Sequence, residues 1–127
     1  MTIGAKVGWG LTGLFALFML GASIAPKLAG MAVADETMVV LGWDPRFVLF
    51  IGMMELALLL LYLLPRTSIL GAVLMTALLG GAIATQLRAG QPLFSHVLFG
   101  VYLGLVMWAG LWLRDPAVRA MLPVRAG

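Results

Sequence analysis

One carboxylate lies in the middle of a long apolar segment. Glu55 is the single acid of residues 46–64, a stretch whose other charged residue, Arg46, begins it. Nine residues of helix place Glu55 about 14 Å into the segment. A carboxylate at that depth is stable when it is protonated, paired with a cation or facing a cavity. Gly52, one turn away on the same face, leaves room for a partner or ligand to reach it.

Other polar side chains end or begin the neighbouring apolar segments. They are Lys27, Gln86, Arg88 and His96. They gather in the half of the protein that we expect to face outward, whereas the inner half holds only Tyr62 and Ser68. This asymmetry predicts an outward-facing cavity with Glu55 beneath it. If Lys27 or Arg88 reached the acid, the two would form a buried ion pair, and otherwise they would extend to the headgroups.

These five residues fit a ligand site and also a structural role. A neutral carboxylic acid donates and accepts hydrogen bonds, which suits a carbonyl or quinone oxygen, so a quinone is the cofactor that they would suit. Glu55 could instead bond Thr12, Thr76, His96 or a backbone carbonyl between helices. His96 could be an interfacial side chain or, with less support, a haem ligand. No metal is expected, because a site needs three or four ligands.

The composition is that of a membrane protein. Of 127 residues, 63% are hydrophobic and 10% are charged, against about 25% charged in soluble domains. The eight Lys and Arg occur singly at segment ends. They therefore indicate membrane topology rather than nucleic-acid binding. The chain has no cysteine, which excludes internal disulfides and Cys-ligated clusters. A soluble enzyme is excluded, and no glycine-rich phosphate loop is present.

Four segments are long enough to cross a bilayer: 7–25, 46–64, 69–87 and 93–113. Nineteen helical residues reach about 28 Å. Two short turns require antiparallel neighbours, so we predict an all-α, integral membrane four-helix bundle in one domain, residues 1–127. A signal peptide is the alternative for the first segment, because Ser23 to Ala25 resemble a cleavage site, but three more spans follow.

The connection 26–45 is the longest and is expected to lie outside the hydrocarbon. Pro26 should end the first helix. Its middle could form a short interfacial helix, and Trp43 could anchor it at the membrane surface. Long connections are often lids or binding elements, so this one could cover the cavity. A loop resting on the headgroups is an equal alternative.

Charge counts and small residues predict topology and packing. Five bases on the side of the termini against three on the other place both termini in the cytoplasm. Seams of small residues are predicted to pack inside one bundle, with a homodimer as the alternative. The seams are Thr12, Ala16, Met19 and Ser23; Ala72, Thr76, Gly80, Ala84 and Arg88, with Ala77, Gly81 and Thr85 beside them; and His96, Gly100 and Gly104. Trp9, Trp108, Trp112 and Arg114 are predicted to form an interfacial aromatic belt.

Three passages resemble the DoxX-like family of small four-helix membrane proteins. They are Gly52-x-x-Glu55, ATQLR…QPLFSH at 84–96 and LWLRDP at 111–116, within a resemblance that covers 7 to about 116. The acid, His96 and Lys27 match positions of that family. The resemblance implies a bacterial inner-membrane protein. It also implies a link to quinone-coupled sulfur oxidation or oxidative-stress complexes, although this chain has no cysteine for sulfur chemistry.

Three functions follow. The first is the membrane subunit of a quinone-linked oxidoreductase or stress-response complex, in which Glu55 and His96 handle protons while a partner subunit carries electrons. The second is a non-catalytic scaffold or anchor in which these two residues join helices. The third, a transporter or proton pathway, ranks lowest because it needs polar groups on both sides of the midplane.

Overall fold

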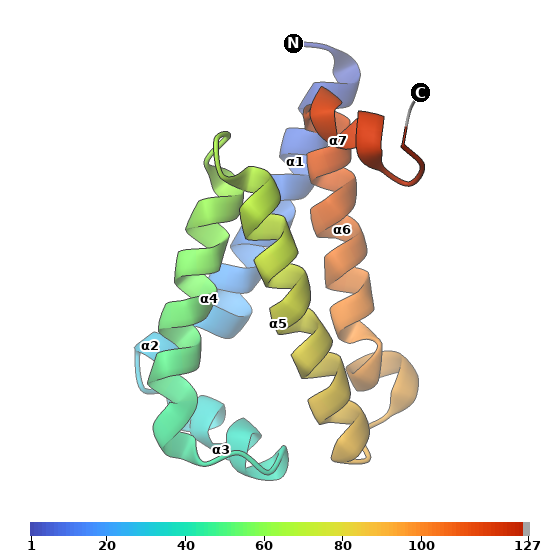
Figure 1. Ribbon diagram of the computed structural model, residues 1–127. Helices are drawn as coiled ribbons and strands as arrows, with labels where there is room; N and C mark the ends of the chain where they lie inside the picture. Colours follow the sequence, from blue (N-terminus) through green and yellow to red (C-terminus); the bar gives the residue numbers. More distant parts are fainter. Residues whose placement is uncertain (126–127) are drawn as a thin grey trace.

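The computed structural model describes residues 1–125, and every element in that range is helical. Four helical stretches are long and apolar enough to cross a membrane: Ile3–Leu28, Pro45–Leu63, Ser68–Arg88 and Leu93–Arg114. They form the upright bundle of Figure 1. The predicted fold class, an all-α four-helix transmembrane bundle, is confirmed.

The first, second and fourth spans are composite. The first joins α1 (Ile3–Phe18), a π-helical turn η1 (Met19–Ile24) and α2 (Ala25–Leu28). The second joins a 3-10 turn η2 (Pro45–Phe47) to α4 (Val48–Leu63), and the third is α5 (Ser68–Arg88). The fourth joins a π-helical turn η3 (Leu93–Val97) to α6 (Phe99–Arg114). The short helices α3 (Ala32–Val40) and α7 (Pro116–Met121) lie at opposite ends of the bundle.

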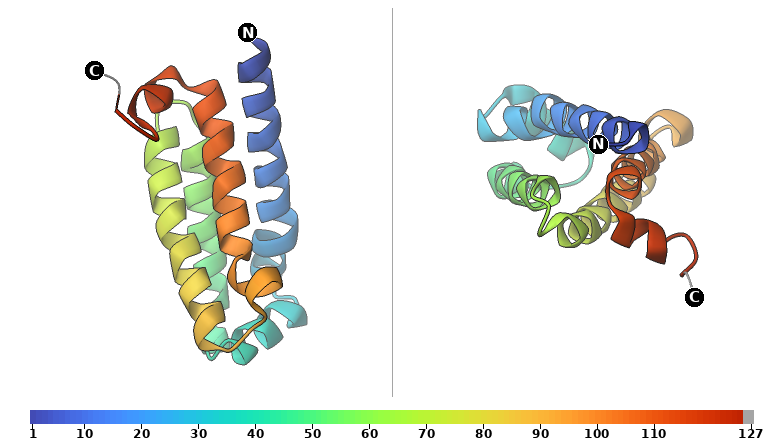
Figure 2. Two further views of the ribbon diagram at one scale, coloured as in Figure 1. Left: turned by 90° about the vertical axis from the view of Figure 1, so that its right-hand side faces the viewer. Right: turned by 90° about the horizontal axis from the view of Figure 1, so that it is seen from above.

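The helices form a ring in which α1 packs on α6, α6 on α5, α5 on α4, and α4 on η1 and α2 (Figure 2). We call the end with both termini and the α4–α5 turn the terminal end, and the other the α3 end. Glycines bring the backbones together at the terminal end: Gly8 packs on Gly110, and Gly71 packs on the backbone of Tyr62. Toward the α3 end, α4 and α5 spread apart (Figure 1).

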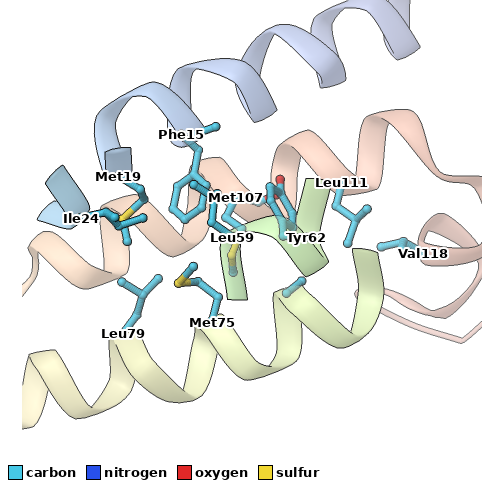
Figure 3. Packing of buried hydrophobic residues seen from close by; sticks show 12 residues of the cluster. Phe15, Met19, Ile24, Leu59, Tyr62, Met75, Leu79, Met107, Leu111 and Val118 are labelled. Carbon is cyan, nitrogen blue, oxygen red and sulfur yellow. The ribbon is translucent and has the colours of Figure 1, made fainter. Parts of the chain in front are cut away.

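The apolar core fills the centre of the ring. Its largest side chains include Phe15, Leu59, Tyr62, Met75 and Met107, all buried (Figure 3). The rings of Phe15 and Tyr62 meet edge to face, with centroids 5.6 Å apart. This packing joins all four spans.

The prediction that Pro26 ends the first helix is wrong. Proline cannot donate a backbone hydrogen bond, and its ring crowds the carbonyl four residues earlier. The wide turn η1 lies immediately before it, and Pro26 sits in the first turn of α2. A π-turn changes the backbone register locally, so the helix absorbs the proline and continues to Leu28. Lys27 therefore lies in the last turn of the helix rather than in a connection.

The small-residue seams gave a mixed result. In the first span Thr12, Ala16 and Met19 are buried, as predicted. In the fourth, Gly100 packs on Ile83 and the Leu79 carbonyl, also as predicted. The seam of the third span is wrong at Gly80, Ala84 and Arg88, which are exposed, whereas Thr76 accepts a hydrogen bond from Trp108 Nε1 of the fourth span. Spacing by four places residues on one side of a helix but does not say which side meets a neighbour.

The buried face of α5 includes Gly71, Ala72 and Met75. The connection after the first span contains the predicted short helix. This helix, α3, crosses the open end of the bundle and buries Met38. Its position over that end decides the shape of the site described next.

Candidate functional site

Glu55 is paired with Lys27 near the α3 end of the bundle. The ammonium Nζ lies 3.1 Å from Glu55 Oε1, and the two side chains are only 13% and 7% exposed. Ser23 completes the group, because its hydroxyl donates to Glu55 Oε2 at 2.8 Å. Lys27 Nζ also donates to Ser23 Oγ at 2.7 Å and to the Ser23 carbonyl at 3.2 Å. We call these three residues the buried pair cluster.

The backbone brings the two charges together. A Cβ on Gly52 would meet Lys27 Cβ at 2.8 Å and Leu28 Cδ2 at 3.2 Å. Only glycine lets α2 lie this close to α4, which places Lys27 over the turn before Glu55. Gly52 was expected to make room for a partner of the acid, and Lys27 is that partner. Two predicted alternatives bond elsewhere: Thr12 contacts Tyr62, and Thr76 donates to the Ala72 carbonyl.

The buried pair cluster lies on the wall of a cavity of about 740 Å³. The rest of the wall is mostly apolar and comes from all four spans. It includes Phe18, Phe50, Met54, Leu78 and Leu103. Because the walls are apolar, hydrogen bonds and charges inside the cavity are less screened than in water.

The connection between the first two spans forms part of the cavity wall. Val33, Thr37 and Met38 of α3 line it, and so does Trp43, which follows α3. Trp43 lines this space and is 46% exposed, and its anchoring role at the membrane surface stays a prediction. The connection is therefore placed to cover whatever the cavity holds.

Four of the five candidate residues line this cavity, and Arg88 does not. Gln86 and His96 lie where it adjoins a smaller hollow of about 250 Å³, which Glu36 and Gln91 also line. The Gln86 oxygen Oε1 is buried and has no hydrogen-bond partner within residues 1–125. His96 is exposed, and its Nδ1 lies 2.8 Å from Ser95 Oγ. Both side chains thus keep hydrogen-bonding capacity for another molecule.

A second polar cluster, which the sequence analysis missed, lies at the terminal end. Arg114 donates to Thr12 Oγ1 at 3.0 Å, to the Tyr62 carbonyl at 3.0 Å and to Ser68 Oγ at 3.4 Å. Its guanidinium lies over the rings of Trp9, at 4.2 Å, and Tyr62, at 5.0 Å. The predicted belt of Trp and Arg at this end is therefore wrong for Arg114, which turns into the bundle.

A signal for the second cluster was present in the sequence. Thr12 lies on the small-residue face of the first span, and Tyr62 and Ser68 were recognised as polar groups in an otherwise apolar half. Buried hydroxyls and carbonyls need donors. Arg114, at the end of the last span, has a side chain long enough to supply them.

The arrangement at the α3 end can bind a polar head in apolar surroundings. The three hydrogens of Lys27 Nζ already have partners, so further bonds must use the lone pairs of Glu55, the Gln86 amide and the His96 ring. These groups can accept from a hydroxyl and donate to a carbonyl. In residues 1–125, no three His, Asp or Glu side chains come together as a metal site would require.

Comparison with protein families identifies residues 10–110 as a DoxX-like family sequence. The match covers most of the chain, from the first span to the end of the fourth, and includes Glu55, Gln86 and His96. Comparisons with the curated proteins and with the solved structures give no match. Four membrane-spanning helices and the family match agree with one another. The chain is therefore an integral membrane protein that belongs to the DoxX-like family.

Proposed function

We propose that the cavity binds a quinone, and that the protein is the membrane subunit of a quinone-linked oxidoreductase or stress-response complex. The observation that carries the proposal is the buried pair cluster on the wall of an apolar cavity. A structural ion pair would be expected in a closed interface, because an adjacent void leaves the charges partly unsatisfied. Here the two charges face a space of ligand size.

The size and the chemistry of the cavity both suit a quinone. Ligand sites are commonly cavities of roughly 300–1,000 Å³ with apolar walls and a few polar groups that orient the ligand. The Glu55 carboxylate accepts a hydrogen bond from a quinol hydroxyl, as does Gln86 Oε1. The Gln86 amide NH₂ and a protonated His96 nitrogen donate to a quinone carbonyl. The wall thus offers groups for both redox forms of one ring.

The proposed chemistry needs a second protein. Interconversion of quinone and quinol moves two electrons and two protons. Glu55 and His96 exchange the protons with the ring, and a partner subunit with a redox cofactor exchanges the electrons. With both termini in the cytoplasm of a bacterium, the α3 end lies in the outer half of the inner membrane, and protons pass between the cavity and the outer side.

A scaffold role is the second candidate. It is favoured by one observation, that Lys27 and Ser23 join the first span to α4 through Glu55. In that role the cluster would hold two spans together for a partner protein and the cavity would have no ligand. The two candidates differ in what the charge-neutral variant of Glu55 does.

Quenching of tryptophan fluorescence by a short-tailed benzoquinone tests the proposal, because Trp43 lines the cavity. Glu55→Gln keeps the shape of the side chain and removes its charge. We expect the affinity for the quinol, measured by its competition with the quinone, to fall about tenfold or more, since a hydrogen bond to a charged group contributes roughly 1.5–3 kcal/mol. Quinone affinity should change less, because the quinone carbonyls accept from Gln86 and His96. Asp35→Asn, the same change at an exposed carboxylate of α3, is the matched control and should bind normally.

Trp43→Phe should remove most of the saturable quenching, which assigns the signal to the cavity. Quinol affinity that is equal in the wild type and in Glu55→Gln would contradict the proposal. Quenching that never saturates would indicate partition into detergent and would favour the scaffold.

A further inference from the structure

The side of α5 that faces α4 changes its environment along the helix. At the terminal end Gly71 lies against the backbone of Tyr62, so the two helices touch. Leu78 and Ala82 lie two and three turns further along the same side of α5. Both line the cavity. The two helices therefore diverge toward the α3 end, as their ribbons do in Figure 1.

The facing side of α4 shows the same change. Phe50 and Met54 are one turn apart, and both line the cavity. Phe50 is also 65% exposed. A side chain that borders the cavity and is this exposed marks the edge of an opening. On the α5 side that edge consists of Ala77 and Gly81, which are exposed and also line the cavity.

The opening lies at the depth of the hydrocarbon. Gly81 is seven residues from Arg88 at the end of α5, which is about 10 Å of helix. None of the four edge residues Phe50, Met54, Ala77 and Gly81 is polar or charged. A Cβ added to Gly81 would have no atom of the described chain within 4 Å. The edge is thus apolar, wide and at a level where lipid chains lie beside it.

We propose that the cavity opens sideways into the bilayer through this window between α4 and α5. Resting on the proposed function, the inference names the ligand class: a quinone with a long polyprenyl tail, whose tail leaves through the window. A cavity of about 740 Å³ holds the ring and the start of the tail. The remainder stays in lipid, so the molecule enters from the membrane and never crosses water.

Two adjacent glycines provide the test. Gly80 and Gly81 both have open space around them, but only Gly81 lines the cavity. Gly81→Phe should fill the window, and Gly80→Phe should place the same ring on the outside of α5. We expect Gly81→Phe to weaken a decyl-tailed benzoquinone about tenfold, by excluding a few methylenes, and to leave the tailless benzoquinone unchanged. Gly80→Phe should bind both compounds as the wild type does.

A second measurement examines the window without a quinone. In bilayers with a photoreactive diazirine fatty acid, Met54 should be labelled in the wild type and several-fold less in Gly81→Phe, with Gly80→Phe as control. Loss of tail selectivity together with unchanged Met54 labelling in Gly81→Phe would overturn the window while leaving quinone binding intact. A wild type that binds neither benzoquinone but shows the labelling difference would keep the window and overturn the proposed function.

Discussion

The two ends of the bundle each place a cation among apolar helices, but they satisfy it differently. At the terminal end the Arg114 guanidinium donates to a hydroxyl of each of two helices and to a backbone carbonyl, between the rings of Trp9 and Tyr62. Glycines hold the backbones close around it. This network closes on itself, so we interpret it as structural.

At the α3 end the cation is paired with an acid, and the pair faces a cavity. Lys27 and Glu55 use one another and Ser23, and the space beside them has unused acceptors in Glu55 and Gln86. The helices are kept apart there, and a short helix covers the gap. The two ends thus use buried polar groups differently. At the terminal end the donors and acceptors bond one another, whereas at the α3 end some acceptors have no partner among the described residues and are available for the proposed ligand.

The largest effect is expected from a methyl group added where the helices touch. Gly71→Ala would force its Cβ into the backbone of Tyr62, which cannot move as a flexible side chain would. We expect a loss of about 3 kcal/mol in the free energy of unfolding, at the upper end for overpacking. Unfolding in mixed micelles with increasing dodecyl sulfate measures it.

Gly81→Ala is the matched control at the open end. It meets no atom of the described chain within 4 Å, so it should be neutral, or stabilising by up to about 1 kcal/mol through helix propensity. Equal destabilisation by the two substitutions would show that the α3 end is as tightly packed as the terminal end, and the comparison would fail.

Arg114→Met is expected to have an intermediate effect. It leaves the Tyr62 carbonyl without this donor and removes the guanidinium from two rings. A loss of about 2 kcal/mol in unfolding free energy follows, because hydrogen bonds from charged groups contribute roughly 1.5–3 kcal/mol. Arg114→Lys should recover only part of this unfolding free energy. An ammonium cannot donate to three separate acceptors as the forked guanidinium does.

Quinol affinity of Arg114→Met, measured by competition with the quinone that quenches Trp43, should equal that of the wild type. A fall in affinity as large as that of Glu55→Gln would mean that the two clusters act as one site.

The sequence was sufficient to predict the four spanning helices and the residues near the cavity. Long apolar segments with charged ends predict spanning helices, and the structure has four helices long and apolar enough to cross a membrane. Glu55 was identifiable because an acid in such a segment requires an explanation. Whether the residues around it bind a ligand remains a prediction.

Sequence reasoning failed where geometry depends on neighbours. Pro26 predicted a helix end, but a π-turn absorbs it and carries Lys27 to Glu55. Arg114 was assigned to the membrane surface, because nothing in its own segment shows that Thr12 and Tyr62 lie across from it. Spacing within a helix is readable from the sequence, whereas the rotation of one helix against another is set by packing.

The smallest change in stability is expected when both charges of the pair are removed. Glu55→Leu alone leaves Lys27 without its carboxylate, and Lys27→Met alone leaves the acid unpaired, so each single variant should be less stable than the wild type.

In the double variant, Lys27→Met with Glu55→Leu, no charge is left unpaired. Replacing a buried pair by apolar side chains is often neutral, so the double variant should unfold within about 1 kcal/mol of the wild type. It should nevertheless bind the quinol about tenfold less tightly or worse, because the quinol hydroxyl loses the Glu55 acceptor. Unchanged stability together with lost binding in the cavity would distinguish the α3 end from the terminal end. A double variant that loses as much stability as Arg114→Met would place the buried pair with the structural network and favour the scaffold.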